Sequence, residues 1–266
     1  MTVPEYGILS RIKPEKKLLV KLAEHAGRNS RGRITVRHQG GGVKRMYRRI
    51  DFKGNDKLGI PARVETLEYD PYRTAFVMKL LYQDGERRYA LAPQGIRIGE
   101  KVIADEFAPF TPGNRLRLKN IPVGYNVYNV ELNPGKGGQI IRSAGSAGEI
   151  LAHDNGYTQI KMPSAEVRKV LWNNFATIGQ VSNIDWGLVN IGKAGRSRKM
   201  GVRPTVRGSA MNPVDHPYGG GEGRQPRGTR KPKTKWGKIT GGRKTRDPKK
   251  WSNALILQKR SRKKRK

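Results

Sequence analysis

Positive charge is concentrated at the two ends of this chain. Residues 1–60 hold 15 basic and 5 acidic side chains, residues 61–190 hold 15 and 13, and residues 191–266 hold 25 and 3. The formal net charge of +34 therefore lies almost entirely outside the middle segment. Like charges at this density repel one another in a compact state, so the ends need a polyanion to neutralise them. The sequence predicts a near-neutral folded middle, two basic arms and nucleic acid as the partner.

Several classes of protein are excluded by what the sequence lacks. There is no Cys, so disulfides, thiolate nucleophiles and Cys-ligated zinc are ruled out. No apolar run approaches the ~20 residues of a membrane-spanning helix. Glu5, Glu15 and Glu24 also argue against a transit peptide, because such peptides are poor in acidic residues. We expect no membrane association and a protein that works where it is made.

The middle segment is typical of short β-strands separated by turns. Residues 75–82 and 87–91 are rich in β-branched and aromatic residues, and they flank Asp84-Gly85. That dipeptide favours a hairpin with a type I′ turn, which needs positive φ at both central residues. A second hairpin is expected over residues 149–162, with its turn at 153–156.

A linker divides these two β units. Pro and Gly are frequent between residues 107 and 114, which favours two small β-barrels in tandem over βαβ units. Helix is expected only over residues 14–23. Tyr128, Trp172 and Trp186 are expected in the core.

A basic segment around a glycine triplet is the first candidate for RNA contact. Without a Cβ, glycine lets the backbone approach a phosphate or sugar, and Tyr47 offers a stacking surface beside the cations. A flexible basic loop is the alternative interpretation. The predicted contacts in this segment are Arg33, Arg37, His38, Gly40, Gly41, Gly42, Lys44, Arg45, Arg48 and Arg49.

Residues 133–139 form a second glycine-containing segment. Their spacing does not match the G-x-x-x-x-G-K-[ST] pattern that places Lys and a hydroxyl on nucleotide phosphates, which argues against an NTPase. We expect a tight turn that presents Lys136 to a single phosphate.

The segment from residue 201 to 224 is rich in Gly and Pro without being low-complexity, and it is expected to be shaped by a partner. Asp215 and His216 are sequence neighbours, which do not make a catalytic triad, and Ser209 lacks a G-x-S-x-G elbow. Asp215 is expected to order the loop as a hydrogen-bond acceptor. The other histidines lack metal-ligand spacing, so neither catalysis nor a metal site is predicted.

The same segment carries a family resemblance. Residues 204–217, PTVRGSAMNPVDHP, followed by GGGEG at 219–223, resemble the signature of the universal ribosomal large-subunit protein two family in its bacterial or organellar form. The similarity runs continuously from about residue 27 to 224 and then loosens. Further matching segments are residues 32–35, His38 with Gly40–Gly42, and residues 69–71, 84–89, 120–124, 134–139 and 192–196.

The resemblance implies an all-β fold of four parts. These are a basic N-terminal extension over residues 1–32, an OB-fold RNA-binding barrel over 33–108, an SH3-like barrel over 109–190, and a Gly/Pro-rich basic C-terminal extension over 191–266 that threads into rRNA. It also implies a structural component of the large ribosomal subunit that supports subunit association and the peptidyl-transferase region. Because RNA performs the chemistry in that family, no catalytic residue is assigned.

The resemblance implies partners and a location as well. The partners are large-subunit rRNA, the small subunit across the interface and neighbouring ribosomal proteins, with no membrane. No cofactor is expected beyond structural Mg²⁺ held by the rRNA. The expected location is a cytoplasmic ribosome, with an organellar ribosome as the alternative.

The site residues of the C-terminal extension follow from the match. His216 falls on the histidine of the family's loop near the peptidyl-transferase region. The basic rRNA contacts implied in this extension are Lys193, Arg196, Arg198, Lys199, Arg203, Arg207 and Arg224. Tyr218, Val43 and Lys199 depart from the family pattern, which weakens any role that needs a histidine or aromatic ring there.

Two other functional classes explain less of the sequence. An RNA-modifying enzyme or nuclease would need a cofactor loop or a carboxylate cluster, yet the last 76 residues hold only Asp215, Glu222 and Asp247. A basic membrane-surface protein would need a strongly amphipathic helix, and only the weak segment 14–26 qualifies.

Overall fold

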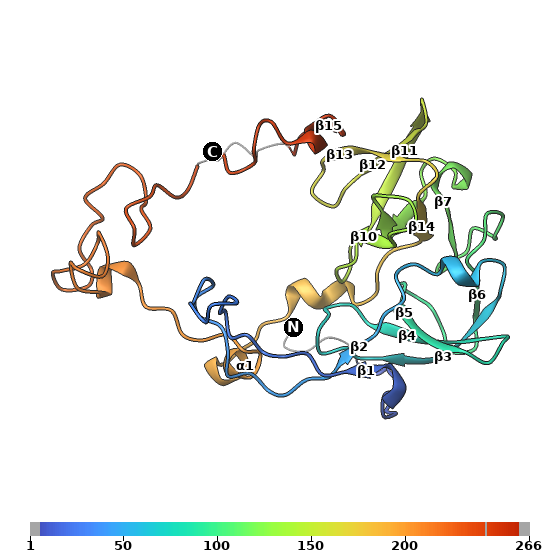
Figure 1. The fold of residues 1–266 in the computed structure, drawn as a ribbon, viewed down its shortest axis with the longest axis horizontal. Coiled ribbons are helices and arrows are strands. Elements are labelled where there is room, and N and C mark those ends of the chain that lie inside the picture. The colour runs from blue at the N-terminus through green and yellow to red at the C-terminus, as the bar shows by residue number, and fades with distance from the viewer. Residues whose placement is uncertain (1–5, 243, 261–266) are drawn as a thin grey trace. The chain divides into compact units, whose positions relative to one another are not determined.

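The computed structural model describes residues 6–242 and 244–260, whose regular secondary structure is mostly β-strand. Within these residues the only α-helix is α1 (Ala194–Lys199). Figure 1 labels this helix and most of the strands. Contacts divide the described chain into two compact units. The first unit is drawn from residues 6–23, 44–192 and 252–260, and the second from residues 24–43, 193–242 and 244–251. The all-β fold class is confirmed.

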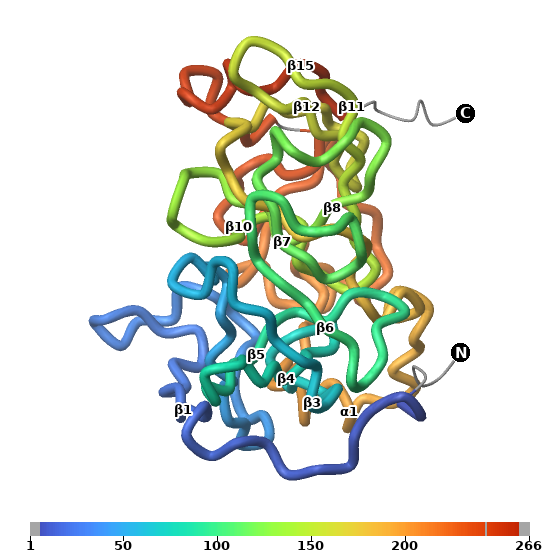
Figure 2. The backbone as a smooth tube through the Cα atoms, turned by 90° about the vertical axis from the view of Figure 1, so that its right-hand side faces the viewer, coloured from blue at the N-terminus to red at the C-terminus, as the bar shows by residue number. Residues whose placement is uncertain are grey.

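A four-stranded antiparallel sheet forms the first barrel of the first unit. The strands are β3 (Ala62–Glu68), β4 (Val77–Tyr82), β5 (Arg87–Leu91) and β6 (Lys101–Val102), in the order β5-β4-β3-β6 (Figure 2). Apolar side chains alternate inward from these strands, so Val64, Leu67, Met78 and Leu80 share one core with Phe76. The expected hairpin over residues 75–91 is confirmed as β4 and β5.

The turn of this hairpin differs from expectation. The Tyr82 N–H donates to the Glu86 carbonyl at 3.0 Å, which leaves a loop of Gln83, Asp84 and Gly85. Within this loop only Gly85 has positive φ, at 81°. The predicted type I′ turn is wrong, because a three-residue loop needs a single left-handed residue where a two-residue type I′ turn needs two.

A seven-stranded sheet forms the second barrel. In chain order its strands are β7 (Arg115–Arg117), β8 (Asn126–Tyr128), β11 (Gly148–Asp154), β12 (Tyr157–Lys161), β13 (Val167–Leu171), β14 (Phe175–Ile178) and β15 (Ile256–Gln258). They lie in the order β15-β13-β12-β11-β8-β14-β7. The second expected hairpin is confirmed as β11 and β12. Its turn residues Asn155 and Gly156 have φ of 46° and 84°, so the type I′ signs occur here.

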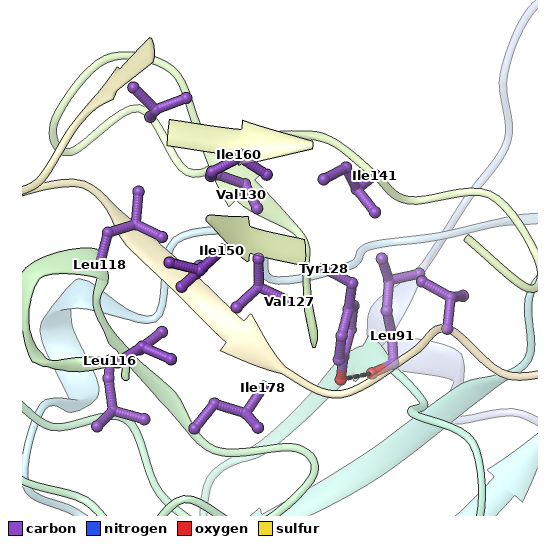
Figure 3. Close-up of a cluster of buried hydrophobic side chains, with 14 of the residues drawn as sticks. Leu91, Leu116, Leu118, Val127, Tyr128, Val130, Ile141, Ile150, Ile160 and Ile178 are labelled. Carbon is purple, nitrogen blue, oxygen red and sulfur yellow. Dashed lines mark hydrogen bonds between the residues drawn. The ribbon is translucent and has the colours of Figure 1, made fainter. Parts of the chain in front are cut away.

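The core of the second barrel is closed by aliphatic side chains from several strands. Leu116, Leu118, Val127 and Ile150 are fully buried and converge in one cluster (Figure 3). Tyr128 lies at the edge of this cluster, and its hydroxyl donates to the Leu91 carbonyl of β5 at 3.2 Å. The core prediction is confirmed for Tyr128. It is wrong for Trp172, whose side chain is 37% exposed, and Trp186 is only half-buried.

Shorter elements make up the rest of the regular structure. Two-residue strands β1 (Leu19–Val20) and β2 (Tyr47–Arg48) pair with each other, as do β9 (Val130–Glu131) and β10 (Gly138–Ile140). Single 3-10 turns cover Lys16–Leu18, Asn55–Lys57, Leu118–Asn120, Ile184–Leu188, Gly208–Ala210 and Trp251–Asn253. The predicted helix over residues 14–23 is wrong, because the chain leaves its 3-10 turn at Leu18 to pair with β2.

The C-terminal segment contributes to the second barrel. β15 pairs antiparallel with β13 through Val167↔Gln258 and Arg168↔Ile256. The Lys169 N–H adds a bond to the Leu255 carbonyl at 2.8 Å. The extension expected over residues 191–266 therefore supplies an edge strand to this sheet.

Candidate nucleic-acid interface

Two cationic segments far apart in sequence meet in the second unit. The Gly40 N–H donates to the Gly201 carbonyl at 2.8 Å, and the Arg203 N–H donates to the His38 carbonyl at 3.0 Å. Gln39 and Val202 form an isolated antiparallel bridge between these bonds. The glycine-triplet segment and the segment after α1, which were predicted separately to contact rRNA, thus form one backbone-paired surface.

The glycine triplet lets the two backbones approach closely enough to pair. A Cβ on Gly42 would lie 3.0 Å from the Gly201 Cα, and a Cβ on Gly40 would lie 2.9 Å from the Ala26 Cβ. Only Gly41 faces open space, and its N–H donates to a Glu24 carboxylate oxygen at 3.2 Å. The expectation that the triplet lets the backbone approach a phosphate is therefore not met at Gly40 and Gly42, where protein occupies that space.

Among the described residues, His38 has a hydrogen-bond partner at only one ring nitrogen. Its Nδ1 lies 2.8 Å from the Pro204 carbonyl oxygen. Because a carbonyl oxygen only accepts, Nδ1 carries the proton and donates. In the neutral ring Nε2 is then an acceptor, which suits contact with a ribose hydroxyl or a base amino group. The residue has φ of 62°, so the segment makes a sharp change of direction here.

His216 is held by its own loop. The ring lies directly over Gly208, where a Cβ would come within 2.5 Å of the ring Cε1. The Tyr218 N–H donates to His216 Nδ1 at 3.1 Å, and the Gly219 N–H donates to the His216 carbonyl at 2.8 Å. Because Nδ1 accepts, the neutral ring carries its proton on Nε2. The loop has more internal structure than the sequence indicated.

Asp215 does not order this loop as expected. Its backbone N–H donates to the Asn212 carbonyl at 3.0 Å, but within the described chain its carboxylate accepts no hydrogen bond. The loop is ordered instead by carbonyls of Met211 and Asn212, which accept from Gly220 and His216 at 3.0 and 3.2 Å. These backbone contacts were not visible in the composition.

Tyr218 ties the loop to the segment that follows it. Its hydroxyl accepts the Lys233 backbone N–H and lies 3.4 Å from the Thr229 hydroxyl. The Arg227 guanidinium lies 6.0 Å from the ring centroid. The Thr229 hydrogen bond, followed by the Lys233 N–H and the nearby cations, lowers the pKa of Tyr218. The same positive surroundings also favour the binding of other anions.

A cationic cavity opens beside His216. It measures about 490 Å³, and none of its lining residues is acidic. The lining side chains with polar or charged groups are Arg207, Ser209, His216, Tyr218, Arg224, Gln225, Arg227 and Lys233. Arg207, His216 and Arg224 were predicted, whereas Arg227 and Lys233 were not. Both belong to the basic tail, but only the fold brings them to this cavity.

Lys136 projects from a loop fixed by a buried ion pair. Glu131 Oε1 accepts from Arg115 Nη2 at 3.0 Å and from the Gly137 N–H at 3.1 Å, and its Oε2 accepts the Phe175 N–H at 3.2 Å. Both charged side chains are buried. The carboxylate therefore anchors the β9–β10 loop from inside while Lys136 stays exposed.

The remaining predicted cations divide by exposure. Arg48 is buried and pairs with Glu68 at 3.3 Å, so the structure gives it a role inside the first barrel and removes it from the accessible contacts. Its burial was hidden in the sequence because Glu68 is distant along the chain. Arg45 and Arg198 are half-buried. The exposed predicted cations are Arg33, Arg37, Lys44, Arg49, Lys193, Arg196, Lys199, Arg203, Arg207 and Arg224.

The described residues show neither a membrane span nor a metal centre. Over residues 6–242 and 244–260, no helix is long and apolar enough to cross a bilayer. The same residues contain no cluster of three or more His, Asp or Glu side chains that could hold a metal ion.

Comparison with protein families gives two matches in tandem. Residues 15–104 match the family model described as Ribosomal Proteins L2, RNA binding N-terminal domain, and residues 111–237 match Ribosomal Proteins L2, C-terminal domain. The first domain is OB-fold-like and the second SH3-like, in agreement with the two barrels and with the resemblance seen in the sequence. The two matches together span most of the chain, which therefore belongs to the ribosomal protein L2 family, RNA-binding structural components of the large ribosomal subunit.

Proposed function

We propose that this protein binds large-subunit rRNA, with the cavity beside His216 as one contact surface, and supports subunit association and the peptidyl-transferase region. The observation that carries the proposal is the acid-free cavity beside His216, into which four cations converge. A site of this kind retains its net positive charge until a polyanion fills it. Phosphate oxygens satisfy both the charge and the fork-shaped donors of arginine.

The cations and the two histidines have separate tasks. The exposed arginines and lysines supply affinity through phosphate contacts and counterion release. His38 and His216 supply direction, since one offers a ring acceptor and the other a ring N–H donor. The protein acts without catalysis and without a cofactor of its own, and Mg²⁺ enters only with the rRNA. The small subunit and neighbouring ribosomal proteins are its other proposed partners, on a cytoplasmic ribosome.

The test is rRNA binding by the full chain as a function of salt. For a large-subunit rRNA transcript, Arg207→Gln and Arg224→Gln should each reduce the slope of log K against log[salt] by roughly 0.7 to 0.9, the value for one phosphate contact. Lys101→Gln is the matched control, because Lys101 is exposed on β6 outside the cavity. An affinity independent of salt, or equal slopes for all three variants, contradicts the proposal. Co-sedimentation with large subunits and with joined ribosomes on sucrose gradients tests the wider role.

A further inference from the structure

Six side chains of the first unit form a contiguous column of arginines and aromatic rings. From guanidinium carbon to ring centroid, Arg45 lies 4.7 Å from Tyr72, Arg73 lies 5.4 Å from Tyr47 and 5.1 Å from Phe52, and Arg142 lies 4.5 Å from Phe52. The Tyr47 and Tyr72 rings meet edge to face at 5.6 Å. We call this column the arginine–aromatic ladder.

The centre of the ladder is fixed by a buried acid. Asp70 is fully buried, and its Oδ2 lies 3.0 Å from Arg73 Nε. Arg73 Nη2 also donates to the Tyr47 hydroxyl at 2.8 Å. Asp70 Oδ1 accepts the Tyr72 N–H at 2.9 Å, which fixes the backbone that carries the exposed ring. The ladder is therefore preorganised by the protein itself.

The two ends of the ladder lack such an acid. Arg45 donates to the Pro71 carbonyl at 3.2 Å and Arg142 donates to the Gly138 carbonyl at 3.1 Å. Among the residues that the structure describes, neither guanidinium has a carboxylate within ion-pair distance. Each keeps donors unused out of the five that an arginine carries. Partial desolvation of its guanidinium, followed by the positive charge of Arg73, lowers the pKa of Arg142.

Three other arginines of the barrels are, by contrast, neutralised within the protein. Arg87 pairs with Glu65 at 3.0 Å, Arg88 with Asp51 at 2.7 Å, and Arg117 with Glu106 at 2.7 Å. Both ends of the ladder thus keep an unpaired charge, and the Arg45 end lies beside Tyr72, which is 36% exposed. Exposed rings interleaved with unpaired cations are the composition of a surface for unpaired nucleotides, because bases stack on the rings while phosphates pair with the cations.

We propose that the arginine–aromatic ladder binds an unpaired stretch of rRNA, with a base stacked on Tyr72 and a backbone phosphate held by Arg142. The inference rests on the proposed rRNA-binding function and names a second contact surface, separate from the His216 cavity. The ladder members come from residues 45–52, 72–73 and 142, so no continuous motif marks the site. A duplex does not fit it, since paired bases are not free to stack on a side chain.

The test measures binding of full-length chain variants to a large-subunit rRNA transcript across a salt series. Arg142→Gln should reduce the salt slope by about 0.7, the value for one phosphate on a single strand. Tyr72→Leu should weaken binding about 5- to 150-fold, the range for loss of one stacked base, with an unchanged slope. Tyr72→Phe keeps the ring and should bind as the parent chain does. Lys101→Gln serves again as the off-ladder control.

The outcomes separate this inference from the proposed function. If the parent chain binds rRNA in a salt-dependent way while Arg142→Gln and Tyr72→Leu both match it, the ladder is only internal packing and the inference is overturned. If the parent chain does not bind, the proposed function fails and this inference fails with it. Melting curves verify folding of each variant. Arg142 is exposed, so its variant keeps the test decisive even if Tyr72→Leu unfolds.

Discussion

Tyr218 donates its backbone N–H to Nδ1 of His216 at 3.1 Å, and the two rings lie 4.9 Å apart. The bond orients the imidazole and sets its neutral tautomer, with the proton on Nε2. The Tyr218 hydroxyl meanwhile accepts from the Lys233 backbone. Tyr218 thus links the His216 loop to the basic tail.

Replacing His216 should impair the assembled particle more than RNA affinity. A single hydrogen bond contributes about 1 kcal/mol, so His216→Ala should change rRNA affinity no more than about fivefold. Peptide-bond formation by reconstituted particles should fall further, because under the proposed function this loop positions RNA. Both quantities should be measured on the same preparation. Normal incorporation with unchanged activity would assign His216 to the loop alone.

A methyl group on Gly42 should weaken the pairing of the two cationic segments. The added Cβ would lie 3.0 Å from both the Cα and N of Gly201, which are backbone atoms that cannot move aside independently. Gly42→Ala should therefore cost about 1 to 3 kcal/mol of stability in the second unit and reduce rRNA affinity. Gly195→Ala in α1 is the control, since its Cβ meets no atom within 4 Å. Proteolysis and rRNA binding report the effect, and equal behaviour of the two variants would contradict it.

The buried pair of Arg115 and Glu131 should be sensitive to removal of one partner. Arg115→Met leaves the Glu131 carboxylate buried without its countercharge, which should cost about 3 to 5 kcal/mol in unfolding free energy. The double variant Arg115→Met/Glu131→Gln should recover part of this loss, because no charge remains buried and the amide oxygen can still accept a backbone N–H. Urea unfolding measures both. A loss below about 1 kcal/mol in the single variant would show that the pair contributes little.

Local patterns in the sequence were sufficient to predict both hairpins, since alternating apolar residues and Asn or Gly turns act over a few positions. They did not distinguish the two turn types, because Asp84-Gly85 fits either a two- or a three-residue loop. They also missed the burial of Arg48 and the pairing of β15, which depend on partners at Glu68 and β13. The ladder was missed for the same reason, as Arg142 meets Phe52 only in the fold.

Asp56 should titrate well below an ordinary aspartate. Its hydrogen bond with Arg88 lowers the pKa of Asp56 to about 2, from a model-compound value of 3.8. Because the folded pKa is depressed, the stabilisation is present above about pH 4 and is lost as the pH falls through about 2. Carboxyl chemical shifts in an NMR titration measure this directly. Arg88→Gln should return the pKa toward 3.8, and an unchanged value would assign the shift to other groups.

Removing the C-terminal segment tests whether the barrels fold without it. Without residues 191–266 the four-stranded sheet keeps all its strands, and the seven-stranded sheet loses only β15. A cooperative melting transition should therefore persist. The midpoint should fall, because β13 loses the bonds of Val167 and Arg168 to β15 and the Lys169 N–H loses its acceptor.

A second variant that lacks residues 191–251 but retains the β15 strand through a flexible Gly/Ser linker should recover part of the lost melting temperature. Circular dichroism melts of both variants and the full chain make the comparison. Loss of the cooperative transition in the shorter variant, without recovery in the linked one, would mean that the second unit is required for the barrels to fold.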